Sequence, residues 1–225
     1  MTPREMQSAF EHEAARFDSP EMLESHIIFY WLNQAQEREV KTSYSGVNSK
    51  GESFESSQKR IDDLRTLVKE EKINITSLGT KPNSVIGVLP IDYWFKLGDE
   101  VDIEYTNINT ITTIKRTGLT DCTVDTYNRQ ISDPYSPHRL HYDDAKPLRL
   151  FYKNQVEIIT DDSYSVNYYY LRYLKKPNKI DLKGSSCELS EHMHSEIVTK
   201  AVNLYLETTG NNRYQSNKIE LNTNE

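Results

Sequence analysis

The strongest strand pattern of the chain lies in residues 163–177, SYSVNYYYLRYLKKP. Side chains at alternate positions of a strand point to opposite faces of the sheet. Along residues 163–174, one face would carry Tyr164, Val166, Tyr168 and Tyr170, and the other Tyr169, Leu171 and Tyr173. Large side chains on both faces predict a strand that is covered on both sides. Pro177 ends this strand, because proline has no N–H group to continue the hydrogen-bond ladder.

A helix is predicted to follow, over about residues 190–209. Ser190 is suited to begin it and Gly210 to end it, because these residue types favour the two helix caps. Its apolar stripe repeats at steps of four, four and three and consists of Met193, Ile197, Ala201 and Leu204. We expect the strand and this helix to form a structural element for assembly and not a catalytic centre.

Three further helices are predicted before residue 75. The first opens with a capping box at residues 2–5, in which Pro3 takes the first helical position. The second starts near Ser19 and runs to about Val40, and the third covers about residues 57–72. Their expected apolar stripes are Met6, Phe10, Ala14 and Phe17 in the first, Leu23, Ile27, Tyr30 and Trp31 in the second, and Ile61, Leu64, Leu67 and Val68 in the third.

The order of the elements predicts an α+β fold. Residues 1–75 and 183–225 would supply a helical bundle and, after residue 211, a flexible tail. Residues 43–57, rich in Ser and Gly, predict a mobile loop or an arm that orders against a neighbour. Residues 76–182 would form a β-rich insertion with an antiparallel, sandwich-like sheet. Its expected parts are strands at 85–89, 101–105, 148–152 and 156–160, turns at Gly98-Asp99 and Asp161-Asp162, and a loop at 132–147.

The composition is that of a polar, acidic chain of 225 residues. It has 34 Asp and Glu against 27 Lys and Arg, a net charge of −7, an apolar fraction of 36% and a mean hydropathy of −0.73. The negative charge disfavours tight binding to the DNA backbone, which depends on Lys and Arg. The two cysteines predict no disulfide framework, and the longest apolar run, residues 27–32, is too short to cross a membrane. Such a composition is typical of an elongated protein or of one stabilised by partners.

The residues around Cys187 are the first candidates for chemistry. Cys187, His192 and His194 are close in sequence, but ligands on one helix need a spacing of three or four to share a face. His192 and His194 are two positions apart, so we predict two exposed histidines, a buried thiol and no metal site.

Two acidic segments are the other candidates. Four carboxylates are predicted to form a solvated strand face: Asp99, Glu100, Asp102 and Glu104. A proline-rich loop contains His138, His141, Asp143 and Asp144, which could serve an enzyme or a divalent ion. No nucleophile motif or phosphate-binding glycine loop accompanies them. We therefore predict no catalytic residues, no cofactor and no enzyme, and keep a site in this loop as a further hypothesis.

The 15 tyrosines leave two readings open. Tyrosines at alternate positions commonly fill a sheet core and its rim. An exposed row can instead bind proteins or sugars, because the rigid ring gives contact area at a low entropy cost. The candidates for contacts between subunits are Tyr164, Tyr168, Tyr170, Met193 and Ile197.

Several segments share a pattern with a known family. They are TPREM (2–6), LPIDY (89–93), LRL (148–150), NQVEI (154–158), YLRYLKKP (170–177), CELSEHMHSEIV (187–198) and Ala201-Val202. Together they resemble the ring, or head-to-tail connector, proteins of crAss-like tailed bacteriophages. Many of those proteins have proline where Ser190 stands, and serine can also cap the helix.

The resemblance implies a structural virion protein that links the portal vertex to the tail around the DNA channel. Such proteins form rings, commonly of about twelve copies, through contacts that repeat and close. The implied partners are further copies, the portal protein and other ring or tail proteins, with DNA passing unbound and no membrane. The implied location is the head–tail junction of the virion, after assembly in the host cytoplasm. The alternative is a tyrosine-bearing β-domain of a tail or baseplate that recognises glycan or protein.

Overall fold

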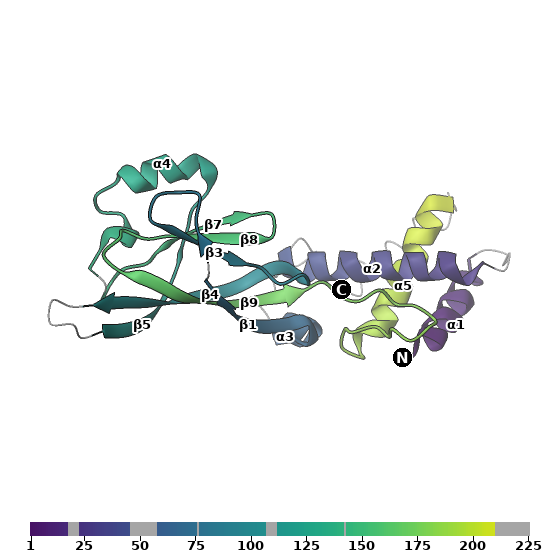
Figure 1. Cartoon of the computed structure of the whole chain (residues 1–225). Helices are drawn as coiled ribbons and strands as arrows, with labels where there is room; N and C mark the ends of the chain where they lie inside the picture. Colours follow the sequence, from purple (N-terminus) through teal and green to yellow (C-terminus); the bar gives the residue numbers. More distant parts are fainter. Residues whose placement is uncertain (18–22, 46–57, 76, 107–111, 142, 210–225) are drawn as a thin grey trace. The chain divides into compact units, whose positions relative to one another are not determined.

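The computed structural model describes residues 1–17, 23–45, 58–75, 77–106, 112–141 and 143–209 (Figure 1). The chain divides into two compact units, Met1–Leu67 with Lys176–Glu225 and Val68–Lys175, which we call the helical unit and the β unit. Helices and two largely antiparallel sheets are both present, so the predicted α+β class is confirmed.

The helical unit contains α1 (Pro3–Ala14), α2 (Ser25–Ser45), α3 (Gln58–Leu64), a 3-10 turn (Arg65–Leu67) and α5 (Met193–Thr209). The predicted capping box of α1 is present. Thr2 Oγ1 accepts from the Glu5 N–H at 3.3 Å, and Glu5 Oε2 accepts from the Thr2 N–H at 2.8 Å. Helix α5 packs against α1 and α2. The buried residues of α1 and α5 are Met6, Phe10, Ala14, Met193, His194, Ile197, Val198, Ala201, Val202, Asn203 and Leu206.

Several boundaries in the helical unit differ from the predictions. The stripe expected for α2 is wrong, because Tyr30 is 57% exposed and the buried stripe runs through Ile28, Leu32 and Ala35. Helix α2 continues to Ser45, so residues 43–45 are helix and not loop. The restart at Ser19, the remaining loop residues 46–57, Gly210 and the tail lie outside the described residues.

Ser190 does not begin α5. Its Oγ donates to the Asp62 carbonyl at 2.8 Å, so the hydroxyl is used by another segment. The first bond of the following turn runs from the Met193 N–H to the Ser190 carbonyl at 2.9 Å, and the helix begins at Met193.

The β unit contains two sheets. The first has the strand order β1-β9-β4-β5, with all neighbours antiparallel. Its strands are β1 (Val68–Asn74), β9 (Ser165–Lys175), β4 (Tyr93–Thr106) and β5 (Thr112–Gly118). The second has the order β2-β3-β8-β7-β6, in which only β6 and β7 pair in parallel. Its strands are β2 (Ser77–Leu78), β3 (Ser84–Val88), β8 (Gln155–Ile159), β7 (Leu148–Tyr152) and β6 (Thr120–Asp121).

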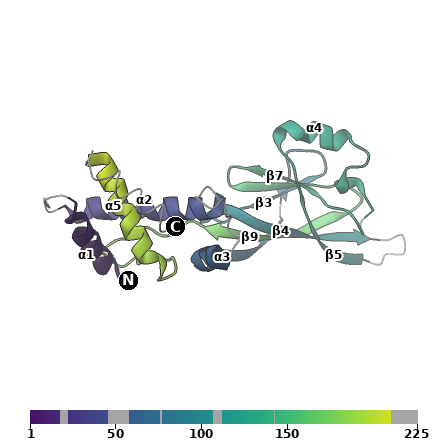
Figure 2. The same ribbon diagram turned by 180° about the vertical axis from the view of Figure 1, so that it is seen from behind.

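The two sheets enclose one apolar core. It includes Val101, Ile103, Tyr169, Leu171 and Tyr173 from the first sheet and Val156 and Ile158 from the second. A second cluster lies on the other face of the second sheet, where Tyr127 and Ile131 of α4 (Val124–Ser132) pack against Cys122, Leu148, Leu150 and Ile159. Figure 1 and Figure 2 show α4 beyond β7, on the side away from β4 and β9. Among the residues that the structure describes, the second sheet is thus covered on both faces and the first sheet on one.

The expectation that residues 163–174 are covered on both faces is therefore wrong. In β9, Tyr169, Leu171 and Tyr173 are buried, whereas Tyr168 is 37% exposed. A register shift against β4 adds one residue between Val166, which pairs with Ile103, and Tyr168, which pairs with Asp102. This irregularity places Val166 on the buried side with Tyr169 and breaks the simple alternation.

Two other segments were assigned wrongly, and one helix was not predicted. Residues 68–72 form strand β1 and not helix, because pairing with β9 overrides the helix propensity of their Lys and Glu residues. Gly98 and Asp99 lie within β4 and do not form the predicted turn. The pairing of β4 with β9 shifts in register between Lys96 and Gly98, and the strand continues. Helix α4 lies at the end of residues 111–131, whose sequence alternates only weakly, and Thr123 caps it by accepting from the Thr126 N–H.

A buried ion pair joins the two sheets. Arg149 of β7, with 1% of its side chain exposed, contacts Asp99 of β4, whose side chain is 6% exposed. Tyr169 of β9 donates its hydroxyl to the same carboxylate at 3.1 Å, and burial, with the Asp99 charge, raises the pKa of Tyr169. Arg149 also contacts Asp121. The carboxylate of Asp99 is therefore part of the core, and the predicted solvated strand face is wrong for this residue.

We expect Asp99→Ala to lower the free energy of unfolding by about 3 kcal/mol, because it leaves the buried guanidinium of Arg149 with one carboxylate partner fewer. Glu100→Ala, at the neighbouring exposed position, is the control and should change it by less than about 0.5 kcal/mol. Urea unfolding followed by intrinsic fluorescence measures both. Equal losses would show that the pair does not stabilise the sheet packing.

Ile197→Asp should destabilise the helical unit by more than about 3 kcal/mol, because Ile197 is fully buried in α5 and a carboxylate there has no partner. Thr208→Asp, on an exposed position of the same helix, should leave stability nearly unchanged. Urea unfolding followed by helical circular dichroism tests this. A normal transition for Ile197→Asp would mean that this side of α5 is not core.

Candidate functional site: an open sheet face with tyrosines and cations

The uncovered face of the first sheet is the candidate site, and we call it the tyrosine face. Strand pairing brings its members together, since Lys72 and Glu100 pair with Tyr170 from either side and Asp102 pairs with Arg116. Its members are Glu70 and Lys72 of β1, Tyr168, Tyr170 and Arg172 of β9, Glu100 and Asp102 of β4, and Ile114 and Arg116 of β5.

Cations cover the tyrosine rings of this face. Lys72 Nζ lies 3.4 Å from the ring centroid of Tyr168 and 5.6 Å from that of Tyr170. Arg116 Cζ lies 3.8 Å from the ring centroid of Tyr170. Such contacts each contribute about 0.5–1 kcal/mol at exposed sites, so the rings and cations form an ordered surface.

Carboxylates balance these cations. Asp102 accepts from Tyr170 Oη at 2.8 Å and from Arg116 Nε at 3.1 Å, and the second bond raises the pKa of Arg116. Glu100 lies 3.9 Å from Arg116, and Glu70 lies 3.5 Å from Arg172. Three cations therefore face these three carboxylates, and Glu104, which pairs with Ile114, adds one negative charge, so the face is close to neutral although the chain carries −7.

A shallow hollow of about 630 Å³ crosses the tyrosine face, bordered by Lys72, Gly98, Glu100, Tyr170 and Arg172 among others. Tyrosine and arginine are the residue types that dominate protein contact surfaces, because each combines apolar area with directed hydrogen bonds. The arrangement therefore suits contact with another protein surface better than the enclosure of a small substrate.

The family model for phage tail ring protein 3/4 matches residues 22–217 of the chain. The chain belongs to this family. It is therefore a structural, tail-associated protein, as the resemblance to the ring proteins of crAss-like phages implies. No curated protein matches the chain. None of the described helices is both long and apolar enough to span a membrane.

The five predicted contact residues of this ring protein do not come together. Tyr168 and Tyr170 lie on the tyrosine face. Tyr164 is 5% exposed and donates its hydroxyl to the His138 carbonyl at 2.9 Å, and Met193 and Ile197 are fully buried in the helical unit. Only Tyr168 and Tyr170 are therefore placed where a neighbour could touch them without opening the core.

Sequence reasoning missed Lys72 and Arg116. Lys72 falls in the segment assigned to a helix, and Arg116 falls in a segment with only weak alternation. The usable signal was the run of four charged residues at 69–72, since charged side chains, Lys above all, are typical of an exposed edge strand.

Cys187, His192 and His194 lie in different environments. His192 Nε2 lies 2.7 Å from Asp63 Oδ1, whereas His194 is 5% exposed and its Nε2 lies 3.0 Å from the Leu189 carbonyl oxygen. The prediction of two exposed histidines is thus wrong for His194, and Cys187 is buried as expected. Within the described residues, no three His, Cys, Asp or Glu side chains are grouped as metal ligands.

The loop predicted at residues 132–147 begins at the last residue of α4 and contains a 3-10 turn (Pro137–Arg139). Its two histidines lie in different environments. His138 is 1% exposed, with its Nδ1 2.9 Å from Ser136 Oγ. His141 is exposed and lies 3.3 Å from Asp143 Oδ2. Burial lowers the pKa of His138, and the nearby Arg139 lowers it further. The backbone carbonyl of His138 accepts from the hydroxyl of Tyr164, which directly precedes β9, so this bond holds the loop at the start of that strand.

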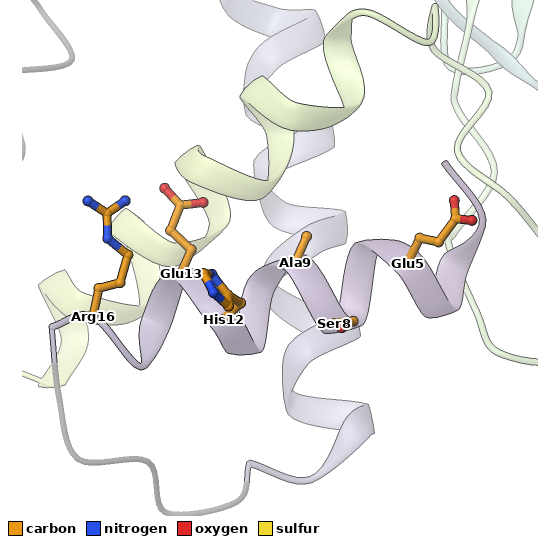
Figure 3. A pocket seen from close by; sticks show the side chains of 6 residues that line it. All are labelled: Glu5, Ser8, Ala9, His12, Glu13 and Arg16. Carbon is orange, nitrogen blue, oxygen red and sulfur yellow. The ribbon is translucent and has the colours of Figure 1, made fainter.

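A hollow of about 660 Å³ lies along α1. Figure 3 shows that its side chains all come from this one helix and its end: Glu5, Ser8, Ala9, His12, Glu13 and Arg16. Glu13 Oε2 accepts from Thr199 Oγ1 of α5 at 3.2 Å, and burial raises the pKa of Glu13. A single helix face has no opposing wall, so this hollow has the form of a surface depression.

Acidification should destabilise the chain partly through His138. The pKa of His138 in the folded chain lies below the ordinary 6.5, so the unfolded chain binds a proton at higher pH than the folded chain does. The stability that His138 contributes above pH 6.5 is therefore lost as the pH falls below that value. His138→Gln should therefore flatten the dependence of unfolding free energy on pH between about 7 and 5. Part of the dependence should remain, because burial also lowers the pKa of His194.

The matched control for this prediction is His26→Gln, because the His26 side chain is 74% exposed. Urea unfolding at a series of pH values compares the three proteins. An unchanged slope for His138→Gln would show that His138 is not kept neutral by the fold.

Proposed function

We propose that the chain is a subunit of a head-to-tail connector, a ring that links the portal vertex to the tail around the DNA channel of a phage virion. The observation that carries the proposal is membership of the tail ring family over residues 22–217. A ring of about twelve copies, with contacts that repeat from one copy to the next, is the form that we expect. The remaining partners would be the portal protein and other ring or tail proteins.

The tyrosine face supports a role in assembly. Tyr168 and Tyr170 are held by Lys72, Arg116 and Asp102, so little side-chain entropy is left to lose when a partner binds. A nearly neutral face also lets subunits that each carry −7 approach one another at short range. We therefore propose Tyr168 and Tyr170 as contact residues between proteins of the assembled tail.

The acidic balance supports passage of DNA. A chain with net charge −7 has little electrostatic attraction for the phosphate backbone, because nonspecific DNA binding depends on an excess of Lys and Arg. A channel lined by such subunits would allow the genome to pass without being held.

Recognition of glycan by the exposed tyrosines is the second candidate. Tyr168 is partly exposed on an open face, which favours it. Sugars stack on the flat faces of aromatic rings, however, and here Lys72 lies over the ring of Tyr168 and Arg116 over that of Tyr170. A sugar would have to displace these cations, so protein contact is the better supported use of the face.

We expect the chain in purified virions, as a ring at the head–tail junction in a virion reconstruction. In solution, mass photometry should find complexes of many 26.2 kDa subunits. Tyr168→Ala with Tyr170→Ala should reduce assembly at least tenfold while preserving the fold, and Tyr135→Ala, which removes an 86% exposed tyrosine elsewhere in the β unit, is the control. A chain absent from virions would overturn the proposal. A glycan that binds the chain and loses binding in the double variant would favour the second candidate.

A further inference from the structure

The first sheet has two edge strands that pair on one side only. Among the described residues, β1 pairs with β9 alone and β5 with β4 alone. Each edge strand has seven residues, VKEEKIN in β1 and TTIKRTG in β5. An edge strand presents unpaired N–H and C=O groups and is a template for another strand.

The two edges run in opposite directions. The sheet has four strands and every neighbouring pair is antiparallel, so β1 and β5 are themselves antiparallel. A second copy placed with its β1 beside β5 would therefore continue the antiparallel pattern. Because this contact joins two different edges, it can repeat from copy to copy and close into a ring.

Charge favours this pairing in its full-length register. When all seven residues overlap, Arg116 lies opposite Glu70 of the next copy, and Lys115 lies opposite Glu71. Glu70 and Arg116 both belong to the tyrosine face, and Glu71 and Lys115 both belong to the opposite face. The tyrosine faces of the two copies therefore lie on the same side of the extended sheet. Opposite charges at paired positions stabilise a sheet.

The symmetric alternatives oppose like charges. Two copies of β5 in full overlap would place Lys115 opposite Lys115. Two copies of β1 would place Glu71 opposite Glu71 at the centre, although Glu70 would then lie opposite Lys72 on either side of it. Like charges directly opposite each other destabilise a sheet. The charge pattern therefore favours the pairing of unlike edges over a two-fold dimer through β5, and in a two-fold pairing of β1 it opposes only the central Glu71 pair.

We infer that strand β5 of one copy pairs antiparallel with strand β1 of the next, in the register that opposes Arg116 to Glu70 and Lys115 to Glu71. The occupant of each edge is a second copy of this chain. The inference rests on the proposed ring and names the contact that builds it. The first sheet then continues from subunit to subunit, and the tyrosine face becomes one continuous surface on that sheet.

A disulfide tests the register. Glu70→Cys with Arg116→Cys in one chain should form a ladder of covalent oligomers on oxidation, because paired Cα atoms of antiparallel strands lie about 4.5–5.5 Å apart, within reach of a disulfide. Within one chain the two edges are three strand spacings apart, roughly 14 Å, so no internal bond competes. Glu70→Cys with Thr112→Cys, shifted by four residues, should give at least tenfold less product. An equal ladder in both proteins, or none in either, overturns the inference.

A charge exchange tests the partner. Glu70→Lys with Glu71→Lys makes both edges basic, and Lys115→Glu with Arg116→Glu makes both edges acidic. Each variant alone should lose assembly, whereas an equal mixture should regain it, since each basic edge then meets an acidic one. The first variant has a net charge of −3 in place of −7. If net charge and not edge pairing governed assembly, this variant alone would assemble more strongly than the wild type.

Circular dichroism must show both variants folded, because Arg116 also contacts Asp102 and Lys115 donates to the Asp143 carbonyl. Undiminished assembly of either variant alone would overturn the inference. If the wild-type chain forms rings while the cysteine variants give no ladder and the charge variants assemble normally, only this contact is ruled out and the proposed connector stands. Absence of the chain from virions would remove the connector, whatever the edges do in solution.

Discussion

The buried contact between Arg149 and Asp99 is the constraint on which the β unit depends. A guanidinium 1% exposed is costly unless it is paired, and its carboxylate partner comes from the opposite sheet, with the Tyr169 hydroxyl as a further donor. The pair is satisfied only when the two sheets are stacked with β7 facing β4. Apolar side chains would tolerate several neighbouring arrangements of the sheets, whereas this pair favours one.

The stacking decides which surfaces remain for other proteins. The second sheet is enclosed between the first sheet and α4, so its polar residues must find partners inside. Glu157 does so, because bonds from Ser84, Lys81 and Thr80 outweigh the effect of burial and lower its pKa. Gly79 is needed beside it, since a Cβ there would lie 1.9 Å from Ser84 Oγ. The first sheet keeps one open face, and the tyrosines with their cations lie on it.

For a tail ring protein this division has a physical use. Subunits of an assembly need rigid surfaces, and the cations and carboxylates around Tyr168 and Tyr170 hold such a surface in place without an apolar patch that would aggregate. The two edge strands are polar as well, with Glu70 and Glu71 on β1 and Lys115 and Arg116 on β5, so neither is the apolar edge that promotes aggregation.

Local patterns determined the elements whose signals lie within a few residues: the capping box at Thr2, the strand end before Pro177, the buried repeat of Met193, Ile197 and Ala201, and the α+β order. The family resemblance also came from sequence alone. Only the tertiary structure decided that residues 68–72 form a strand, that Asp99 is buried, and that Tyr168 and Tyr170 face outward with Lys72 and Arg116. These outcomes depend on pairing between strands about a hundred residues apart and on one added residue near Asn167, whose free energies no local pattern contains.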